Sequence, residues 1–420
     1  MIRINTKKTG NTLFNWGLVL LAISIPVSIF FMGVAVGFLG AAFLIKIFTG
    51  ELKIIKTGLE IPLGLFILAY LISTILGSPE PWESLKYIFN KHGWMFCMVF
   101  MIYMFKPEHI WKFLKLMAWS AVVAGIYTVV QGFSGWALLG GLAASIEEGL
   151  LSSISMGRDR IAPVTEFLGI TLYRGSGVFS HHLDLGGQMA MLSFVSWTII
   201  KKKRYFMFIP AALFFSFAYS AWGGFILGLI YILAVKNKKV IYGLAVLVVF
   251  TSIFLSVPGN ISVVKEKFSG RLAIWEASIH MYKSSPIVGI GAGRYTPRFK
   301  ENNYREKFPH LPTSGSKVHP HSIYLSMLVR GGAVTFAAFL FFLLKFMQLY
   351  IRPPKDFKFK KFNKVYDFLW AALFSVFSAG IFQTYLTSAQ NSVLIWTLIG
   401  IIISLKYHYS QKSKDGIPTR

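Results

Sequence analysis

The sequence predicts an all-α, polytopic membrane protein, and three observations support this fold class. Only 14% of the 420 residues are charged and 55% are hydrophobic, whereas a soluble domain carries about a quarter charged residues. Apolar runs recur along the whole chain, and about 20 apolar residues are enough to cross the hydrocarbon core. Basic residues flank these runs, as they do on the cytoplasmic side of membrane proteins. We therefore predict a single integral membrane domain over residues 1–420.

The apolar runs define about 12 transmembrane helices. The first follows a basic N-terminal tail with no cleavage site of small residues, so we interpret it as a retained span. Some runs are short, and Gly and Ser interrupt the stretches 13–48 and 205–235 only weakly, so the division of each into two spans is open. The predicted spans are 13–31, 33–48, 61–77, 94–105, 111–133, 186–200, 205–218, 220–235, 240–257, 322–350, 366–386 and 390–405.

The distribution of charge between the loops predicts the orientation. The two termini and the short loops on their side hold 26 of the 43 Lys and Arg residues, while the opposite loops hold 11 of the 17 acidic residues. Because Lys and Arg accumulate on the cytoplasmic side, we expect both termini to be cytoplasmic. An even number of spans agrees with this arrangement.

Two outward loops, at about 135–185 and 256–320, are too long to be simple turns, and loops of that length usually carry function or structure of their own. The second contains a predicted helix at Ser269–Lys283, which ends before a Ser-Ser-Pro stop signal. In the first loop, Ala144–Met156 and Val164–Leu172 are candidates to lie along the membrane surface. No pair of broken spans occupies matching positions in two halves, which argues against a transporter built from repeats.

The formal charge of +26 does not indicate nucleic-acid binding, because the basic residues border spans and form no recognisable binding motif. The single cysteine, Cys97, lies in an apolar run and has no partner for a disulfide or a Cys-containing metal site. We interpret it as a packing residue.

His321 is the first candidate for chemistry. It follows Pro320 at the predicted beginning of an apolar helix, at the membrane boundary. The positive end of a helix dipole disfavours an imidazolium, and a neutral imidazole can accept a proton from a hydroxyl. The spacing fits equally well a histidine that caps or anchors the helix. His319, two residues earlier, and Ser322, the next residue, are possible supporting residues.

Two arginines in the long loops are candidates to bind a diphosphate. Arg271 opens the predicted loop helix, with Trp275 one turn later on the same face. Arg174 lies in an Arg-Gly-Ser-Gly segment whose glycines allow close approach of a ligand. Each guanidinium can offer paired N–H donors to phosphate oxygens. On spacing alone, a solvated arginine beside an interfacial tryptophan explains Arg271 and Trp275 at least as well.

Other patterns give weaker signals. The Gly289–Gly293 stretch lacks the Lys-Ser/Thr of a phosphate loop and no strand precedes it, so a flexible turn is the better interpretation. His181 and His182 are adjacent and do not face one site on a helix. The outward loops contain no Asp-x-Asp pair, which argues against an enzyme that uses sugar nucleotides with a divalent metal. We predict no metal site and no cofactor.

Three segments together resemble the O-antigen ligase and polymerase family of bacterial envelope glycosyltransferases. The ligase pattern is His, then Asn, Ser or Gln, nine residues, Gly, two residues, and Gly, Thr or Tyr, which His321, Ser322, Gly332 and Thr335 match in full. The stretch from Gly270 to Tyr295 resembles the second signature of the family, and Arg174–Phe179 resembles its Arg-x-x-Gly segment.

This resemblance implies a GT-C-like fold and a metal-independent, inverting glycosyltransferase in the bacterial inner membrane. Its active site would face the periplasm, where both long loops would lie. Arg174 and Arg271 would hold the diphosphate of an undecaprenyl-diphosphate-linked glycan, and His321 would deprotonate the acceptor hydroxyl. The closest match is an O-antigen ligase of lipopolysaccharide biosynthesis, whose acceptor is a lipid A-core sugar.

One position departs from the family. Two residues before Gly332, where the family often has an acid, this chain has Arg330, about 13 Å into the span at 1.5 Å per residue. A charge at that depth is usually paired or functional. An O-antigen or capsule polymerase and a protein O-oligosaccharyltransferase are alternatives within the family. A lipid-linked sugar transporter is the alternative from another class.

Overall fold

A computed structural model describes residues 6–135, 163–167, 169–179, 181–237, 239–240, 260–308, 318–353 and 360–414. Two sequence predictions, the helix at 144–156 and nearly all of the span at 240–257, lie outside these residues. The described helices are α1 Thr6–Ser24, α2 Ile29–Phe48, α3 Glu60–Gly77, α4 Pro81–His92, α5 Phe96–Met104, α6 Pro107–Ser134, α8 His182–Ile199, α9 Lys203–Phe206, α10 Phe208–Phe215, α11 Tyr219–Lys236, α13 Asn260–Ser284, α14 Tyr295–Glu301, α15 Tyr304–Lys307, α16 Ile323–Tyr350, α17 Lys360–Ala379 and α18 Ala389–Lys414.

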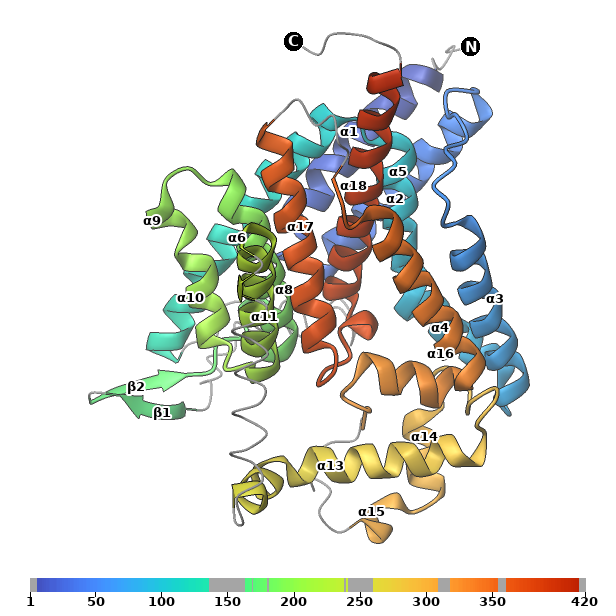
Figure 1. Cartoon of the computed structure of the whole chain (residues 1–420), viewed down its shortest axis with the longest axis vertical. Coiled ribbons are helices and arrows are strands. Elements are labelled where there is room, and N and C mark those ends of the chain that lie inside the picture. The colour runs from blue at the N-terminus through green and yellow to red at the C-terminus, as the bar shows by residue number, and fades with distance from the viewer. Residues whose placement is uncertain are drawn as a thin grey trace, which may run out of the picture.

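The long helices form a bundle, as Figure 1 shows. Six of the described helices, α2, α3, α6, α11, α16 and α18, are long and apolar enough to cross a membrane. The chain is therefore a mostly helical, multi-pass membrane protein, and the count of 12 spans stays a prediction. At the centre, α18 is almost fully buried, with leucine, isoleucine and tryptophan side chains packed among the other helices.

A second, smaller layer covers one end of the bundle. The beginning of α1 and the end of α18 lie at one end, while α13, α14 and α15 lie across the other (Figure 1). These three helices enclose their own apolar cluster, which includes Ala277, Met281, Tyr295 and Phe299 and also contacts Val329 of α16. The second long loop, which carries these helices, thus lies at the end of the bundle opposite the described termini (Figure 1), and the side of the membrane that each end faces stays a prediction.

The segment Val164–Leu172, a candidate to lie along the membrane surface, belongs to a β-hairpin, and its position relative to the membrane stays a prediction. Residues Pro163–Phe167 and Ile170–Tyr173 form two antiparallel strands, β1 and β2. Each strand contains two β-branched residues, Val164 and Thr165 in β1 and Ile170 and Thr171 in β2, and such residues favour extended backbone. Gly169 has φ +75°, a turn conformation that glycine adopts without strain. The hairpin leads directly into the segment that carries Arg174.

A sharp break divides α16 at Gly332, where φ is 68° and ψ is −174°. A side chain at this position would collide with the carbonyl oxygen of Ile287. The break frees backbone groups of α16, and the 285–293 turn binds them: the Ile290 and Gly291 amides donate to the carbonyls of Val329 and Arg330, each at 3.0 Å. The glycine-rich stretch is thus neither a phosphate loop nor a loose turn, because it holds α16 in its broken form.

Candidate functional site

His321 lies immediately before α16 in an unusual conformation, with φ +48°. The next residue, Ser322, caps the helix, since its Oγ accepts a hydrogen bond from the Leu325 amide at 3.3 Å. The amide of Ile323 donates to the carbonyl of Gly380 at 2.7 Å. These bonds fix the beginning of α16 against the segment that follows α17, and they give Ser322 a structural role.

That segment, residues 380–384, also binds the His321 side chain. The Nδ1 atom of His321 lies 2.9 Å from Oε1 of Gln383. Because an amide oxygen can only accept, Nδ1 carries the hydrogen and Nε2 keeps a free lone pair. Burial lowers the pKa of His321; the Gln383 hydrogen bond opposes this shift, and the charges of Arg271 and His181 add to it. The ring is therefore a neutral base with one defined acceptor nitrogen.

Arg271 contacts the same segment. One of its guanidinium nitrogens, Nη1, donates to the carbonyl oxygen of Phe382, the residue before Gln383. The prediction that Arg271 opens the loop helix is wrong, because α13 begins at Asn260 and Arg271 lies well inside it. The helix continues upstream because residues 260–268 contain no glycine or proline to stop it.

Arg174 follows β2, and its side chain is exposed. The adjacent glycines have a packing role: a side chain at Gly175 would crowd Thr128 of α6, and Gly177 exchanges two hydrogen bonds with the Gln131 side chain, at 2.8 and 2.9 Å. They allow the segment to lie directly on α6, which positions Arg174 beside the beginning of α8.

Electrostatic interactions connect the three predicted residues. Burial is the largest cause that lowers the pKa of His181, while Asp184 raises it and the charge of Arg174 lowers it further. His181 in turn lowers the pKa of His321, as Arg271 does. Arg174 therefore acts on His181, and His181 and Arg271 act on His321. Only His321 and Arg271 are bonded to the same segment, residues 380–384, among the contacts that the structure describes.

His181 and His182 do not form a metal site. Their rings stack at 4.3 Å, and Nδ1 of His181 accepts a hydrogen bond from the Leu183 amide at 3.2 Å, which caps α8. Within the described part of the chain, no group of three or more His, Cys, Asp or Glu residues is arranged to hold a metal ion. His319 is half-buried and precedes Pro320 in irregular chain, and its supporting role stays a prediction.

Arg330 belongs to a different environment. Its side chain is only 2% exposed, its Nη1 donates to the Tyr87 hydroxyl at 2.7 Å, and its guanidinium carbon lies 5.2 Å from the centre of the Tyr87 ring. No described acidic residue forms an ion pair with it. Arg330 therefore connects α16 to α4, and nothing in these contacts connects it to His321.

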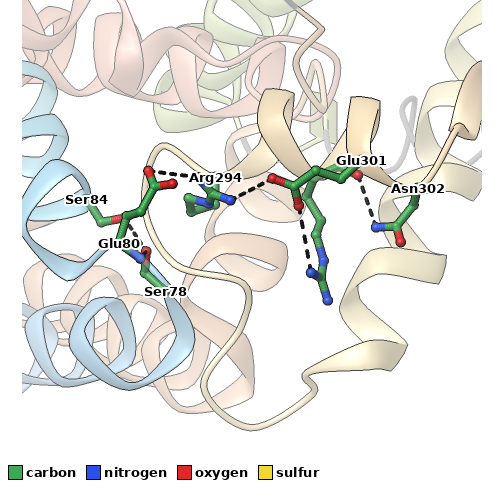
Figure 2. A network of polar contacts seen from close by, with 7 residues as sticks. Ser78, Glu80, Ser84, Arg294, Glu301 and Asn302 are labelled. Carbon is green, nitrogen blue, oxygen red and sulfur yellow. Dashed lines mark hydrogen bonds and ion pairs between the residues drawn. The ribbon is translucent and has the colours of Figure 1, made fainter.

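A second network holds the small layer against the bundle (Figure 2). Arg294, just before α14, forms ion pairs with Glu80 at 2.9 Å and with Glu301 at 2.8 Å. Ser78 and Ser84, on either side of Glu80, are joined by a 2.7 Å hydrogen bond. We call the two ion pairs of Arg294 the Arg294 clamp. The clamp fixes the 285–293 turn and α14 relative to α4, and so restrains the layer from which Arg271 reaches the site.

Sequence reasoning missed Gln383 and Phe382. Both lie in what was predicted to be the span 366–386, but α17 ends at Ala379, and the chain then turns before the short 3-10 helix Tyr385–Thr387 (η2). The polar pair Gln383-Thr384, inside an otherwise apolar run, was the available signal that the span ends early.

The fold and this site define a class: a multi-pass helical membrane protein in which a neutral histidine and an arginine are bonded to one segment, residues 380–384. Residues 204–340 match the family model described as O-antigen ligase. This match covers less than half of the chain and supports the resemblance that the three motifs indicated, to a family whose members are glycosyltransferase-like enzymes. The matched segment contains Arg271 and His321 and excludes Arg174 and Gln383. No curated protein matches the chain.

Proposed function

We propose that this protein is an O-antigen ligase. It transfers a polymerised glycan from undecaprenyl diphosphate to a sugar hydroxyl of lipid A-core, at the periplasmic face of the bacterial inner membrane. The observation that carries the proposal is the hydrogen bond from His321 to Gln383, which leaves Nε2 as a base beside the charge of Arg271.

The reaction follows from these roles. The acceptor hydroxyl gives its proton to Nε2 of His321 while its oxygen attacks the anomeric carbon of the donor sugar. The bond between that carbon and the diphosphate oxygen breaks, and both electrons leave with the undecaprenyl diphosphate. Attack from the face opposite the leaving group inverts the configuration at the anomeric carbon.

The leaving diphosphate gains negative charge as the bond breaks. Arg174 and Arg271 are placed to neutralise it, because cations directed at developing charge lower the barrier in a site shielded from water. The beginnings of α8 and α16 both lie at this site, and the positive ends of helices also favour an anion. The two arginines supply the charge that a divalent metal supplies in other glycosyltransferases, so we propose a metal-independent reaction.

A polymerase or a protein O-oligosaccharyltransferase of the same family would use the same chemistry and differ only in the acceptor. The full match of the nine-residue spacing after His321 favours the ligase. The transporter hypothesis is less well supported, because Arg271 lies on α13, which is not one of the six candidate spans, and Arg174 lies in the segment before α8.

The proposal is tested with purified protein, a lipid-linked glycan and lipid A-core. His321→Ala is expected to reduce transfer by at least about 100-fold, the usual contribution of a general base. Arg174→Lys and Arg271→Lys are expected to retain little activity, since an ammonium cannot make the two-pronged contact of a guanidinium. Transfer by each variant is measured against its folding, monitored by size-exclusion chromatography.

His280→Ala and Arg298→Lys are the matched controls, because both residues lie on the small layer and away from the 380–384 segment. Both are expected to keep wild-type transfer. Full activity of correctly folded His321→Ala would rule out the base role, and inhibition of the wild-type enzyme by a chelator would rule out the metal-independent reaction.

A further inference from the structure

Two aromatic rings lie directly beside the proposed catalytic residues. Trp275 of α13 and Phe382 of the 380–384 segment are stacked, with ring centres 5.7 Å apart and planes inclined by 21°. Trp275 also packs on the apolar cluster of the small layer. Stacking joins two elements that are more than one hundred residues apart in the sequence.

The pair is only partly covered. The side chain of Phe382 is 38% exposed, and Trp275 is half-buried. The indole Nε1 is shielded from water and has no hydrogen-bond partner within the described residues. The exposed part of the pair therefore offers an apolar aromatic surface.

The same pair is rigidly tied to the catalytic groups. Arg271 lies one turn before Trp275 on the same face of α13, and its guanidinium is bonded to the carbonyl of Phe382. The next residue, Gln383, holds His321. A molecule resting on the aromatic pair would thus lie next to both the diphosphate-binding arginine and the base.

We infer that Trp275 and Phe382 form a stacking subsite for a pyranose ring, the sugar that is bonded to the diphosphate of the donor. This inference rests on the proposed function. A pyranose has one face of C–H groups that fits an aromatic surface, and this face can lie on the exposed part of the Phe382 ring. With the diphosphate on Arg271, the first sugar of the glycan is the part of the donor nearest to the rings. Stacking there would orient the anomeric carbon toward His321.

The inference is tested by saturation-transfer NMR on the full-length protein in nanodiscs. The probes are methyl glycosides of glucose, galactose and N-acetylglucosamine. We expect saturation to be concentrated on the C–H protons of one ring face in at least one probe.

Trp275→Leu and Phe382→Leu should weaken binding by about tenfold, while Trp275→Phe, which keeps an aromatic face, should retain most of it. Trp82→Leu, at a 68% exposed tryptophan on α4, is the matched control and should bind as the wild type does.

Two results would overturn the subsite. One is saturation that is absent in the wild-type protein, or that is unchanged in Trp275→Leu. The other is that the fluorescence removed by Trp275→Phe is quenched by lipids brominated in their acyl chains, which would make Trp275 a membrane-interface residue. The binding measurements are repeated in the His321→Ala protein. If the wild-type enzyme binds the sugar but does not transfer glycan, only the proposed function is contradicted. If Trp275→Leu and Phe382→Leu leave transfer unaffected, only the subsite is contradicted.

Discussion

His321 has a backbone conformation that few residues with a side chain adopt. Its φ of +48° is in the left-handed region, which costs a non-glycine residue of order 1 kcal/mol or more. The surrounding bonds maintain it: Ile323 is bound to Gly380, and the imidazole is bound to Gln383. Strain that is maintained in this way is typical of functional sites, where geometry matters more than local stability.

The dependence of activity on pH tests the partnership of His321 and Gln383. Only the neutral imidazole can act as the base, so activity is lost as pH falls through the pKa of His321. Because burial lowers that pKa, wild-type activity should persist below pH 6.5, the usual value for histidine. Gln383→Glu places a negative charge beside Nδ1 and should raise the pKa, shifting the acid limb of the rate profile upward by about one pH unit or more.

Gln383→Leu is the companion variant. It removes the bond that selects the tautomer, so kcat should fall while the acid limb does not move upward. An acid limb at the same pH in the wild-type and Gln383→Glu enzymes would show that Gln383 does not act through His321.

Individual residues could be predicted from the sequence where a short pattern carries them. The spacing from His321 to Gly332 and the arginines in the long loops identified His321, Arg174 and Arg271 as candidates. Gln383 could not be found in this way, since its partner is 62 positions away and the contact exists only after the chain turns at Gly380. The charge at Arg330 was visible in the sequence, but its pairing with Tyr87 on α4 was not.

At the scale of elements, the break in α16 explains two sequence features at once. Gly332 of the ligase pattern provides the backbone conformation of the break, and the 285–293 turn supplies hydrogen bonds to the freed carbonyls. Ser73 of α3 completes the set by donating to the Gly331 carbonyl at 2.8 Å and contacting Thr335, the last residue of the pattern, at 2.9 Å. Part of the family pattern therefore has a structural role.

Gly332→Ala tests the break. A methyl group would meet the carbonyl oxygen of Ile287, and the left-handed φ is strained for alanine. We expect the free energy of unfolding to fall by about 2 kcal/mol or more, with loss of transfer, and thermal unfolding monitored by fluorescence measures it. Gly37→Ala, in α2 with open space around it, should be neutral or stabilising. Equal melting temperatures for the Gly332→Ala and wild-type proteins would contradict a required break.

Helices were predicted more successfully than their ends. Long apolar segments of the sequence identify α2, α3, α6, α11, α16 and α18, because length and hydropathy alone define such spans. The hairpin at β1 and β2 was missed, since short alternating segments give a weak signal, and the early end of α17 was missed because the apolar run continues past it.

At the scale of the whole molecule, the small layer lies at the end of the bundle opposite the described termini (Figure 1). Counting Lys and Arg predicts that the termini share one side and the long loops the other, and the structure places the small layer opposite the beginning of α1 and the end of α18 (Figure 1). The Arg294 clamp then holds that layer on the bundle (Figure 2). The sequence could not predict this docking, because it depends on contacts between α4 and α14, which are far apart in the chain.

The most direct test of the central claim is a lipopolysaccharide gel of a strain that lacks this protein. The account predicts that all banded glycan on the core is lost while glycan accumulates on its carrier. The wild-type protein should restore the bands, and His321→Ala should not. A single repeat unit on the core would indicate a polymerase, and banding that is unchanged by the deletion would contradict the account.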